Sequence, residues 1–296
     1  MRLRRCLFIA VAPSILLLTS CGVDLDRGKL RVTVLDVGQG DSILVETPSG
    51  RTMLIDGGGP NDESEVDPAE VGRKTVIPYL RYRGIGKLDV VVLTHPHSDH
   101  SGGLVAVLKD EQVGAVLDGT VLPYKTPTYC AFLGEIRDEH IPYAHAERGT
   151  HLDFHDGVVC DVLNPPASGT PYGTGLDNTT VNNYSAVIRL TYGRTHFMLD
   201  GDAEEEAEDN MLATGADVSA DVLKCGHHGA ANATSDEWLA SVRPKFAAIS
   251  CGLHNPFGHP NPATMERLKQ HGVKTFVTAW NGAAVFVSDG SVVRVD

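Results

Sequence analysis

The sequence has no internal repeat of fixed length, no low-complexity tract and no segment polar enough to predict disorder. These absences exclude a repeat array and a mainly disordered chain. Of the 296 residues, 42% are hydrophobic, which is enough to bury one large core or two small ones. No linker divides the halves of the chain, so we expect one domain over residues 30–296.

Positive charge is also scarce. The chain has 25 lysines and arginines against 38 acidic residues, a formal net charge of −13. Residues 1–20 hold three arginines and no acid, so the chain from residue 21 onward carries −16. An acidic chain gains little from releasing the counterions of a nucleic acid. We therefore expect no extended basic face for duplex DNA, which leaves small phosphodiesters and single-stranded nucleic acid as partners.

The N-terminal segment has the features of an export signal. Three arginines among the first five residues precede an apolar run, residues 6–18, that is too short to span a membrane. The run leads into Leu18-Thr19-Ser20-Cys21-Gly22, which resembles the lipobox of bacterial lipoproteins. The alternative is an ordinary signal with a fortuitous cysteine. We expect a signal peptide over 1–20, lipidation of Cys21, a tether over 21–29, and an exported chain anchored on the extracytoplasmic side of the membrane.

Four further cysteines lie in the predicted domain: Cys130, Cys160, Cys225 and Cys251. An even number of cysteines in an exported chain suggests disulfides. We favour a Cys225–Cys251 pair, because each of these residues follows an apolar run typical of a strand. Cys130 and Cys160 would form the remaining pair.

The order of predicted elements indicates two mixed sheets with helices outside them. Strands are predicted at 30–36, 42–47, 52–56, 88–94, 184–191, 195–199, 221–225, 245–250, 274–278, 283–287 and 292–295. Helices are predicted at 74–82, 104–109, 204–212, 235–242 and 262–270. Residues 111–180 show no clear pattern.

The strongest motif is Thr94-His95-Pro96-His97-Ser98-Asp99-His100, at the end of the buried strand predicted over 88–94. Three histidines and an aspartate within six residues are costly to bury without a partner. Imidazole and carboxylate are ligands that zinc prefers, and a site with open positions suits catalysis. The alternative is a solvated histidine-rich loop. We therefore predict a metal site here.

This motif resembles the HxHxDH signature of the metallo-β-lactamase superfamily, whose fold is a four-layer αββα sandwich of class α+β. Two other segments match the family pattern, Leu54-Ile55-Asp56-Gly57-Gly58 and Met198-Leu199-Asp200-Gly201-Asp202. The resemblance implies two divalent metal ions, zinc or alternatively manganese. The ligands implied are His95, His97, Asp99, His100, the bridging Asp202, and His228.

Further motifs narrow the resemblance. Residues 34–42, His227-His228-Gly229, residues 249–252 and Gly258-His259-Pro260 follow one another as they do in the soluble metallo-β-lactamase-like domain of the DNA-uptake protein ComEC. They are also similar to secreted phosphodiesterases such as phosphorylcholine esterases. The similarity covers residues 30–296 apart from 111–180.

One position departs from the family pattern. Where superfamily members carry a third histidine for the first metal, this chain has Asn182-Asn183. The first site is then three-coordinate from protein, or is completed by Asn183 or water, and Asn183 is also a candidate for substrate binding. His151, His155 and His196 are other candidates, although a lone histidine in a loop is more often simply exposed.

The resemblance implies a metal-dependent phosphodiesterase in which a metal-bound hydroxide attacks phosphorus. Asp99 would orient the hydroxide, and His259 or His227 would protonate the leaving oxygen. Gln39 and Asp41 lie in a glycine-rich turn that either faces the substrate or is plain turn chemistry. Two alternatives stay open: hydrolysis of a lactam, lactone or thioester, and a non-catalytic metal-binding surface lipoprotein.

Overall fold

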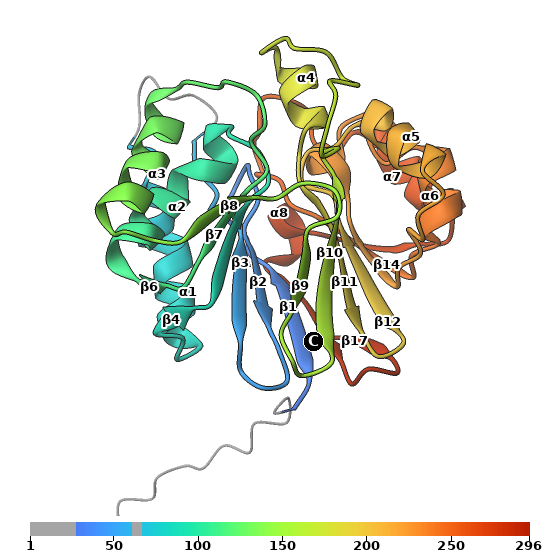
Figure 1. The fold of residues 1–296 in the computed structure, drawn as a ribbon. Coiled ribbons are helices and arrows are strands. Elements are labelled where there is room, and N and C mark those ends of the chain that lie inside the picture. Colours follow the sequence, from blue (N-terminus) through green and yellow to red (C-terminus); the bar gives the residue numbers. More distant parts are fainter. Residues whose placement is uncertain (1–27, 61–66) are drawn as a thin grey trace, which may run out of the picture.

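The computed structural model describes residues 28–60 and 67–296, so Cys21 and the predicted signal peptide lie outside the described residues. Two β-sheets stack face to face, with α1, α2 and α3 outside the first sheet and α5, α6 and α7 outside the second (Figure 1). Both sheets contain parallel and antiparallel pairs. The predicted four-layer αββα sandwich is confirmed.

The first sheet has eight strands in the order β17-β16-β1-β2-β3-β5-β7-β8. They are β1 (Leu30–Val34), β2 (Ile43–Glu46), β3 (Thr52–Ile55), β5 (Val90–Leu93), β7 (Val116–Asp118), β8 (Tyr143–His145), β16 (Ala284–Ser288) and β17 (Val293–Val295). The second has seven, in the order β15-β14-β13-β12-β11-β10-β9. They are β9 (His151–Asp153), β10 (Val158–Asn164), β11 (Val187–Tyr192), β12 (Thr195–Leu199), β13 (Val222–Lys224), β14 (Phe246–Ile249) and β15 (Lys274–Val277).

Helices and short connecting elements complete the layers. A separate two-stranded ribbon pairs β4 (Lys87–Leu88) with β6 (Gln112–Val113). The helices are α1 (Ile77–Tyr82) with a π-helical turn before it (Gly72–Val76), α2 (Ser98–Asp110), α3 (Pro127–Asp138), α4 (Asn178–Asn183), α5 (Glu205–Ala213), α6 (Asp236–Val242), α7 (Pro262–Gln270) and α8 (Thr278–Asn281). A 3-10 turn covers Gly226–Gly229.

The alternation of side chains along each strand separates the three parts of the core. On β3, Met53 and Ile55 point into the layer between the sheets, while Leu54 faces the first helical layer. On β12 and β13, Met198 and Leu223 pack with Trp238 of α6 in the outer layer of the other half. Because both faces of these strands are covered, their sequences contain continuous runs of apolar residues.

Most predicted elements are confirmed, and α7 spans Pro262–Gln270 as expected. The helix predicted over 104–109 begins six residues earlier, at Ser98, so the aspartate and last histidine of the motif lie in its first turn. Residues 111–180, which had no clear pattern, contain α3, the start of α4 and five strands, β6 to β10.

The glycine pair of α2 allows this helix to pack closely against the first sheet. Gly102 and Gly103 lie within α2 and pack against the loop after β3. The amide of Gly103 donates to the carbonyl of Gly58 at 2.7 Å, and the amide of Gly57 donates to the carbonyl of His100 at 2.8 Å. A Cβ at Gly103 would lie 1.9 Å from the Gly57 oxygen. The close approach fixes the helix that carries the motif beside the end of β3.

We expect Gly103→Ala to destabilise the protein by about 3 kcal/mol or more, because backbone must move in a packed region. The matched control is Gly134→Ala in α3, where a Cβ meets nothing within 4 Å and the helix gains up to about 1 kcal/mol. The measurement is urea denaturation of both variants. Equal stability of the two would contradict the close-packing argument.

The predicted disulfides are wrong. Cys130, Cys160, Cys225 and Cys251 are all free thiols, and all but Cys130 are buried. Cys225 and Cys251 follow two adjacent parallel strands, β13 and β14, and are packed separately into the outer core layer. Burial raises the pKa of the Cys225 thiol to about 12 and that of Cys251 to about 11. Both are therefore inert core residues.

Within the described residues, none of the helices has the length and apolar character needed to cross a membrane.

Candidate metal centre

The predicted ligands gather at one edge of the sandwich because the strands that carry them end there. His95 follows β5, Asp202 follows β12 and His228 follows β13. The pairs β3·β5 and β12·β13 are parallel, so their carboxyl ends meet at this edge. The loop between β1 and β2, which holds Gln39 and Asp41, lies at the same edge (Figure 1).

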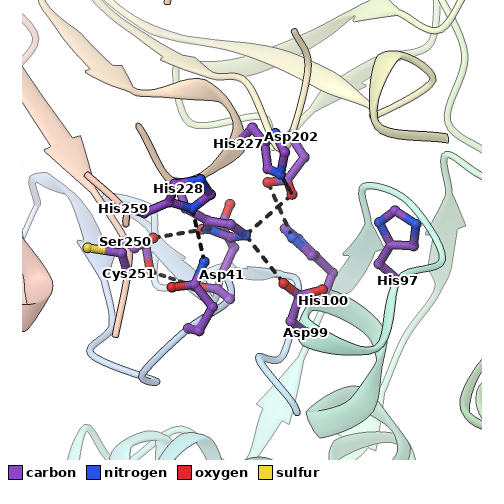
Figure 2. Close-up of polar contacts among 12 residues, drawn as sticks. Asp41, His97, Asp99, His100, Asp202, His227, His228, Ser250, Cys251 and His259 are labelled. Atoms are coloured by element: carbon purple, nitrogen blue, oxygen red, sulfur yellow. Dashed lines mark hydrogen bonds and ion pairs between the residues drawn. The ribbon is translucent and has the colours of Figure 1, made fainter. Parts of the chain in front are cut away.

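Four of the predicted ligands converge around one point. His228 Nε2 lies 3.3 Å from Asp202 Oδ2 and 3.4 Å from Asp99 Oδ2. His100 Nε2 lies 3.3 Å from the other oxygen of Asp202. Figure 2 shows His228 facing Asp99 and Asp202, with His100 beside them. These are the separations expected of ligands that share a tetrahedral ion.

The remaining two predicted ligands form a second group beside the first. His95 Nε2 lies 3.0 Å from His97 Nδ1 and 3.9 Å from Asp202 Oδ2. The other ring nitrogen of His95 lies 3.2 Å from the hydroxyl of Ser185. Asp202 thus lies between both groups, where its carboxylate would contact an ion held by either one.

Neighbouring residues orient the imidazoles of the first group. The Nδ1 atom of His100 lies 2.8 Å from Asp56 Oδ2, and Thr94 donates its backbone amide and its hydroxyl to Asp56. The Nδ1 atom of His228 lies 2.9 Å from the carbonyl oxygen of Ser250. Holding Nδ1 in this way leaves Nε2 as the free donor atom for a metal.

The residues present fit a divalent metal. Buried polar atoms without a hydrogen-bond partner include the Nε2 atoms of His100 and His228 and one oxygen of Asp202. Such atoms are rare in folded proteins, and three that converge point to an ion that binds them. His100, Asp202, His228 and Asp41 offer ligand atoms that all lie within 4.8 Å of one another.

The charges of the site agree with this fit. Asp202 is buried, and the neighbouring imidazoles of His228 and His100 outweigh its burial and hold its pKa well below the usual range. Burial opposes protonation of His100 and His228, but Asp202 and the other carboxylates raise the pKa of both imidazoles well above 6.5. Burial lowers the pKa of His95, so its imidazole stays neutral, as a ligand must be.

Asp41 does not face the substrate cavity, which was one of the two alternatives for it. Its side chain is fully buried beneath His228, with Oδ1 3.4 Å from Nδ1 (Figure 2). Asp41 forms an ion pair with Lys224, whose ammonium group also donates to the carbonyl of Gly201 at 2.8 Å. Asp41 is therefore a buried partner of His228 and Lys224 at ligand distance from the centre, and it does not line the cavity.

Lys224 is a site residue that the sequence analysis missed. It is fully buried at the end of β13, and its Nζ atom lies 3.9 Å from Asp202 Oδ1. Burial alone would lower its pKa, but Asp41 and Asp202 raise it, so the lysine stays charged. The sequence feature that could have indicated it is a single lysine at the end of an otherwise apolar strand, because a lysine buried there needs a partner of opposite charge.

Asn183 likewise does not line the cavity, either to bind substrate or to complete the first metal site. Its Oδ1 atom accepts from the backbone amides of Glu204 and Ala207, so it caps the first turn of α5. The cavity is instead lined by Asn182, whose amide donates to Glu204 Oε1 at 2.9 Å. Consecutive residues of a helix point in different directions, and the sequence alone did not show which asparagine faces inward.

The other histidine candidates for the first metal group lie apart from it. His151 and His155 are exposed at β9 and the turn after it, and they pair with Asp161 and Asp153. His196 on β12 contacts the hydroxyl of Thr191.

The remaining predicted residues line a cavity of about 480 Å³ above the ligands. His227 lies with Nδ1 3.0 Å from Glu204 Oε1, and His259 with Nδ1 3.3 Å from the amide of Gln39. Burial and the neighbouring His228 and His227 lower the pKa of His259 to about 4, which makes it neutral at pH 7. The lining residues are Gln39, His97, Ser98, Asp99, Tyr124, Thr126, Asn178, Asn182, Asp202, His227, His228, Phe257 and His259.

Comparison with known proteins identifies the class. A family model for the metallo-beta-lactamase superfamily matches residues 35–253, and the chain belongs to this superfamily. CmlA, a diiron beta-hydroxylase from Streptomyces venezuelae, superposes with a TM-score of 0.52 at 12% identity, over 87% of this chain and 54% of that one. An isothiocyanate hydrolase from Delia radicum gut bacteria superposes with a TM-score of 0.50 at 13% identity, over 86% of this chain and 97% of that one. At such identities these likenesses show the fold alone.

The predicted resemblance to a DNA-uptake protein is also confirmed. ComE operon protein 3 of Bacillus subtilis (strain 168) is 33% identical over 261 residues, covering 85% of this chain and 32% of that protein. Competence protein ComA of Neisseria gonorrhoeae is 32% identical over 256 residues, covering 86% and 32%. The chain therefore spans about a third of the length of these relatives.

We expect metal binding to release about two protons near pH 7, because the imidazoles of His100 and His228 hold protons until a metal takes their Nε2 atoms. Metal affinity should accordingly rise with pH up to the raised pKa values. Calorimetric titration with zinc in buffers of different ionisation enthalpy measures the release. A His196→Gln control should release as many protons as the wild type, and identical heats in all buffers would contradict the expectation.

Lys224→Met should lower the free energy of unfolding by about 3–5 kcal/mol, because it leaves the buried Asp41 carboxylate unpaired. The control is Lys245→Met, whose 73% exposed side chain pairs with Asp221 and should cost at most about 1 kcal/mol. Urea denaturation measures both. Adding Asp41→Asn to Lys224→Met should restore part of the loss, and similar losses in the two lysine variants would refute a special role for the buried pair.

Proposed function

We propose that this chain is a metal-dependent phosphodiesterase of the metallo-β-lactamase superfamily, which acts on small phosphodiesters or single-stranded nucleic acid. The observation that carries the proposal is the convergence of His100 Nε2, His228 Nε2, Asp99 and Asp202 at the floor of an open cavity. His95 and His97 would hold a second ion on the other side of Asp202.

Bound divalent ions would lower the pKa of water, supply hydroxide near neutral pH and stabilise the charge on a phosphoryl group. Zinc suits the imidazole-rich ligand set, and manganese is the alternative. The remaining work falls to the residues of the cavity. Asp99 is only partly buried, so one face of its carboxylate is available to orient the attacking water.

We assign protonation of the leaving oxygen to His227. It lines the cavity with 26% of its side chain exposed, and the Glu204 carboxylate at its Nδ1 atom fixes the ring. Glu204 is itself held by the amides of Asn182 and Asn232 at 2.9 and 2.7 Å. His259 is tied to Gln39 and is therefore assigned to hydrogen bonding with the substrate.

The substrate class also draws on the relatives. Two of them are named for competence or for the ComE operon, which favours a nucleic acid substrate for this chain as well. The net charge of −13 argues against an extended binding surface for duplex DNA. We further propose that the chain is exported and held at the membrane by a lipid on Cys21, on its extracytoplasmic side, as the lipobox-like sequence suggests.

The test is hydrolysis of bis-p-nitrophenyl phosphate by the full chain with zinc or manganese added after chelation. We expect metal-dependent turnover that falls by about 10³-fold or more in Asp99→Ala, because a ligand and the group that orients water are lost together. His196→Ala removes a histidine outside the site and should retain full activity.

Metal content separates the competing functions. If a protein that still binds two ions shows no turnover, the phosphodiesterase proposal is refuted. Hydrolysis of acyl substrates and a binding role would then remain. A protein that binds no metal would refute the centre itself.

A further inference from the structure

The walls of the cavity above the metal ligands contain no lysine or arginine among the residues that the structure describes. Proteins that bind nucleic acid through its phosphates use such side chains, and their affinity then depends steeply on salt. Among the described residues of the cavity, the positive charge available to a phosphate would come from the imidazoles at the floor, together with bound metal ions. Any further affinity must come from uncharged contacts.

Phe257 is the large apolar residue exposed at this cavity. Its side chain lines the cavity yet is 54% exposed. One face of the ring stacks on His259, with the ring centroids 5.7 Å apart and the planes 28° apart. Because His259 covers only one side, a flat apolar surface remains open beside the proposed reaction site.

The loop that presents Phe257 is held in place by one side chain. Asn255 donates to the carbonyls of Gly252 and His259 at 2.7 and 2.6 Å. Its Oδ1 atom accepts from the amides of Phe257 and His259 at 3.2 and 2.9 Å. An exposed aromatic ring on an anchored backbone is typical of a binding surface, since stability gives no reason to hold it there.

A second aromatic ring lines the cavity from the other half of the sandwich. Tyr124, between β7 and α3, packs edge-on against His97 with centroids 5.8 Å apart. Phe257 follows β14 of the second sheet. Aromatic rings from both halves therefore flank the metal ligands.

We propose that Phe257 is a stacking platform for the base of the nucleotide next to the scissile phosphate, so that the substrate is a single-stranded polynucleotide. This inference rests on the proposed phosphodiesterase function and adds the residue that selects the substrate. A base of any identity offers a flat π-face, so stacking of this kind is tolerant of sequence. A duplex, whose bases are already stacked, would not present one.

The experiment compares two substrates of the full chain that have the same phosphates. One is a short oligothymidylate, and the other has abasic tetrahydrofuran units in place of every nucleoside. We expect the wild type to prefer the oligothymidylate, and Phe257→Ala to lower kcat/KM on it about tenfold, mainly through KM. The abasic oligomer should be cleaved equally by both proteins, and Phe257→Trp should retain the preference.

Leu253→Ala is the matched control, because Leu253 is 63% exposed in the same loop and does not line the cavity. It should leave both substrates unaffected. An equal loss on both oligomers in Phe257→Ala would mean that the ring merely supports His259, and no loss on either would mean that it binds nothing. Both outcomes overturn the proposal.

Two further readouts separate this inference from the function beneath it. Turnover of bis-p-nitrophenyl phosphate without preference between the oligomers would leave the phosphodiesterase standing and refute the stacking platform, whereas no turnover of any substrate would refute both. If stacking replaces basic side chains, KM for oligothymidylate should change by less than about threefold between about 50 and 200 mM salt. A steep salt dependence would overturn the proposal.

Discussion

Repulsion among buried carboxylates is the constraint on which the site depends. Asp41, Asp56 and Asp202 are buried at one edge of the sandwich, and Asp99 lies beside them. Water cannot screen these charges, so each needs a positive partner within the protein or from bound ions. Lys224 serves Asp41, and protonated His100 and His228 serve the others until metals replace those protons. The metal centre is thus part of what allows these acids to be buried together.

The architecture around the site follows from this concentration of charge. Parallel strands from both sheets end at the same edge, which brings Asp56, His95, Asp202 and His228 together from distant parts of the chain. The glycines at the start of α2 let the backbone approach the end of β3 closely enough for His100 to reach Asp56. A wider approach would leave His100 without the carboxylate that orients it.

Much of this was predictable from the sequence, because periodic apolar runs mark strands that end in a metal-ligand motif. The sheets, the helices of the second half and the convergence of His95, Asp99, His100, Asp202 and His228 all follow from such patterns and from the family resemblance. The elements in the middle of the chain were not predicted, although Thr126 and Pro127 cap the start of α3 in a recognisable way. Four of the five strands there have only two or three residues, and in β10 the apolar Val159 and Leu163 occupy partly exposed positions, so polar and apolar residues do not alternate in the sequence.

Within the site, the role of a residue could not be predicted from the sequence where contacts between distant parts of the chain decide that role. Asp41 reads as a turn residue or a substrate contact until Lys224, 183 residues away, is seen to pair with it. Asn182 and Asn183 are adjacent and chemically identical, and only the direction of α4 separates the one that lines the cavity from the one that caps α5. The cysteines were misjudged because export suggests disulfides, whereas packing needed small apolar side chains at Cys225 and Cys251.

The same electrostatics couple substrate binding to metal binding. Without ions, the floor of the cavity pairs Asp99 and Asp202 with the protonated imidazoles of His100 and His228, and its walls carry no lysine or arginine among the described residues, so a phosphate would meet no net positive charge. Two divalent ions would replace those protons and make the floor positive while leaving the walls neutral. Binding of an anionic substrate is then confined to the point where hydrolysis takes place, because no other part of the cavity attracts it. A basic cavity would bind polynucleotides along its whole length, but this one would hold a phosphate only at its metals.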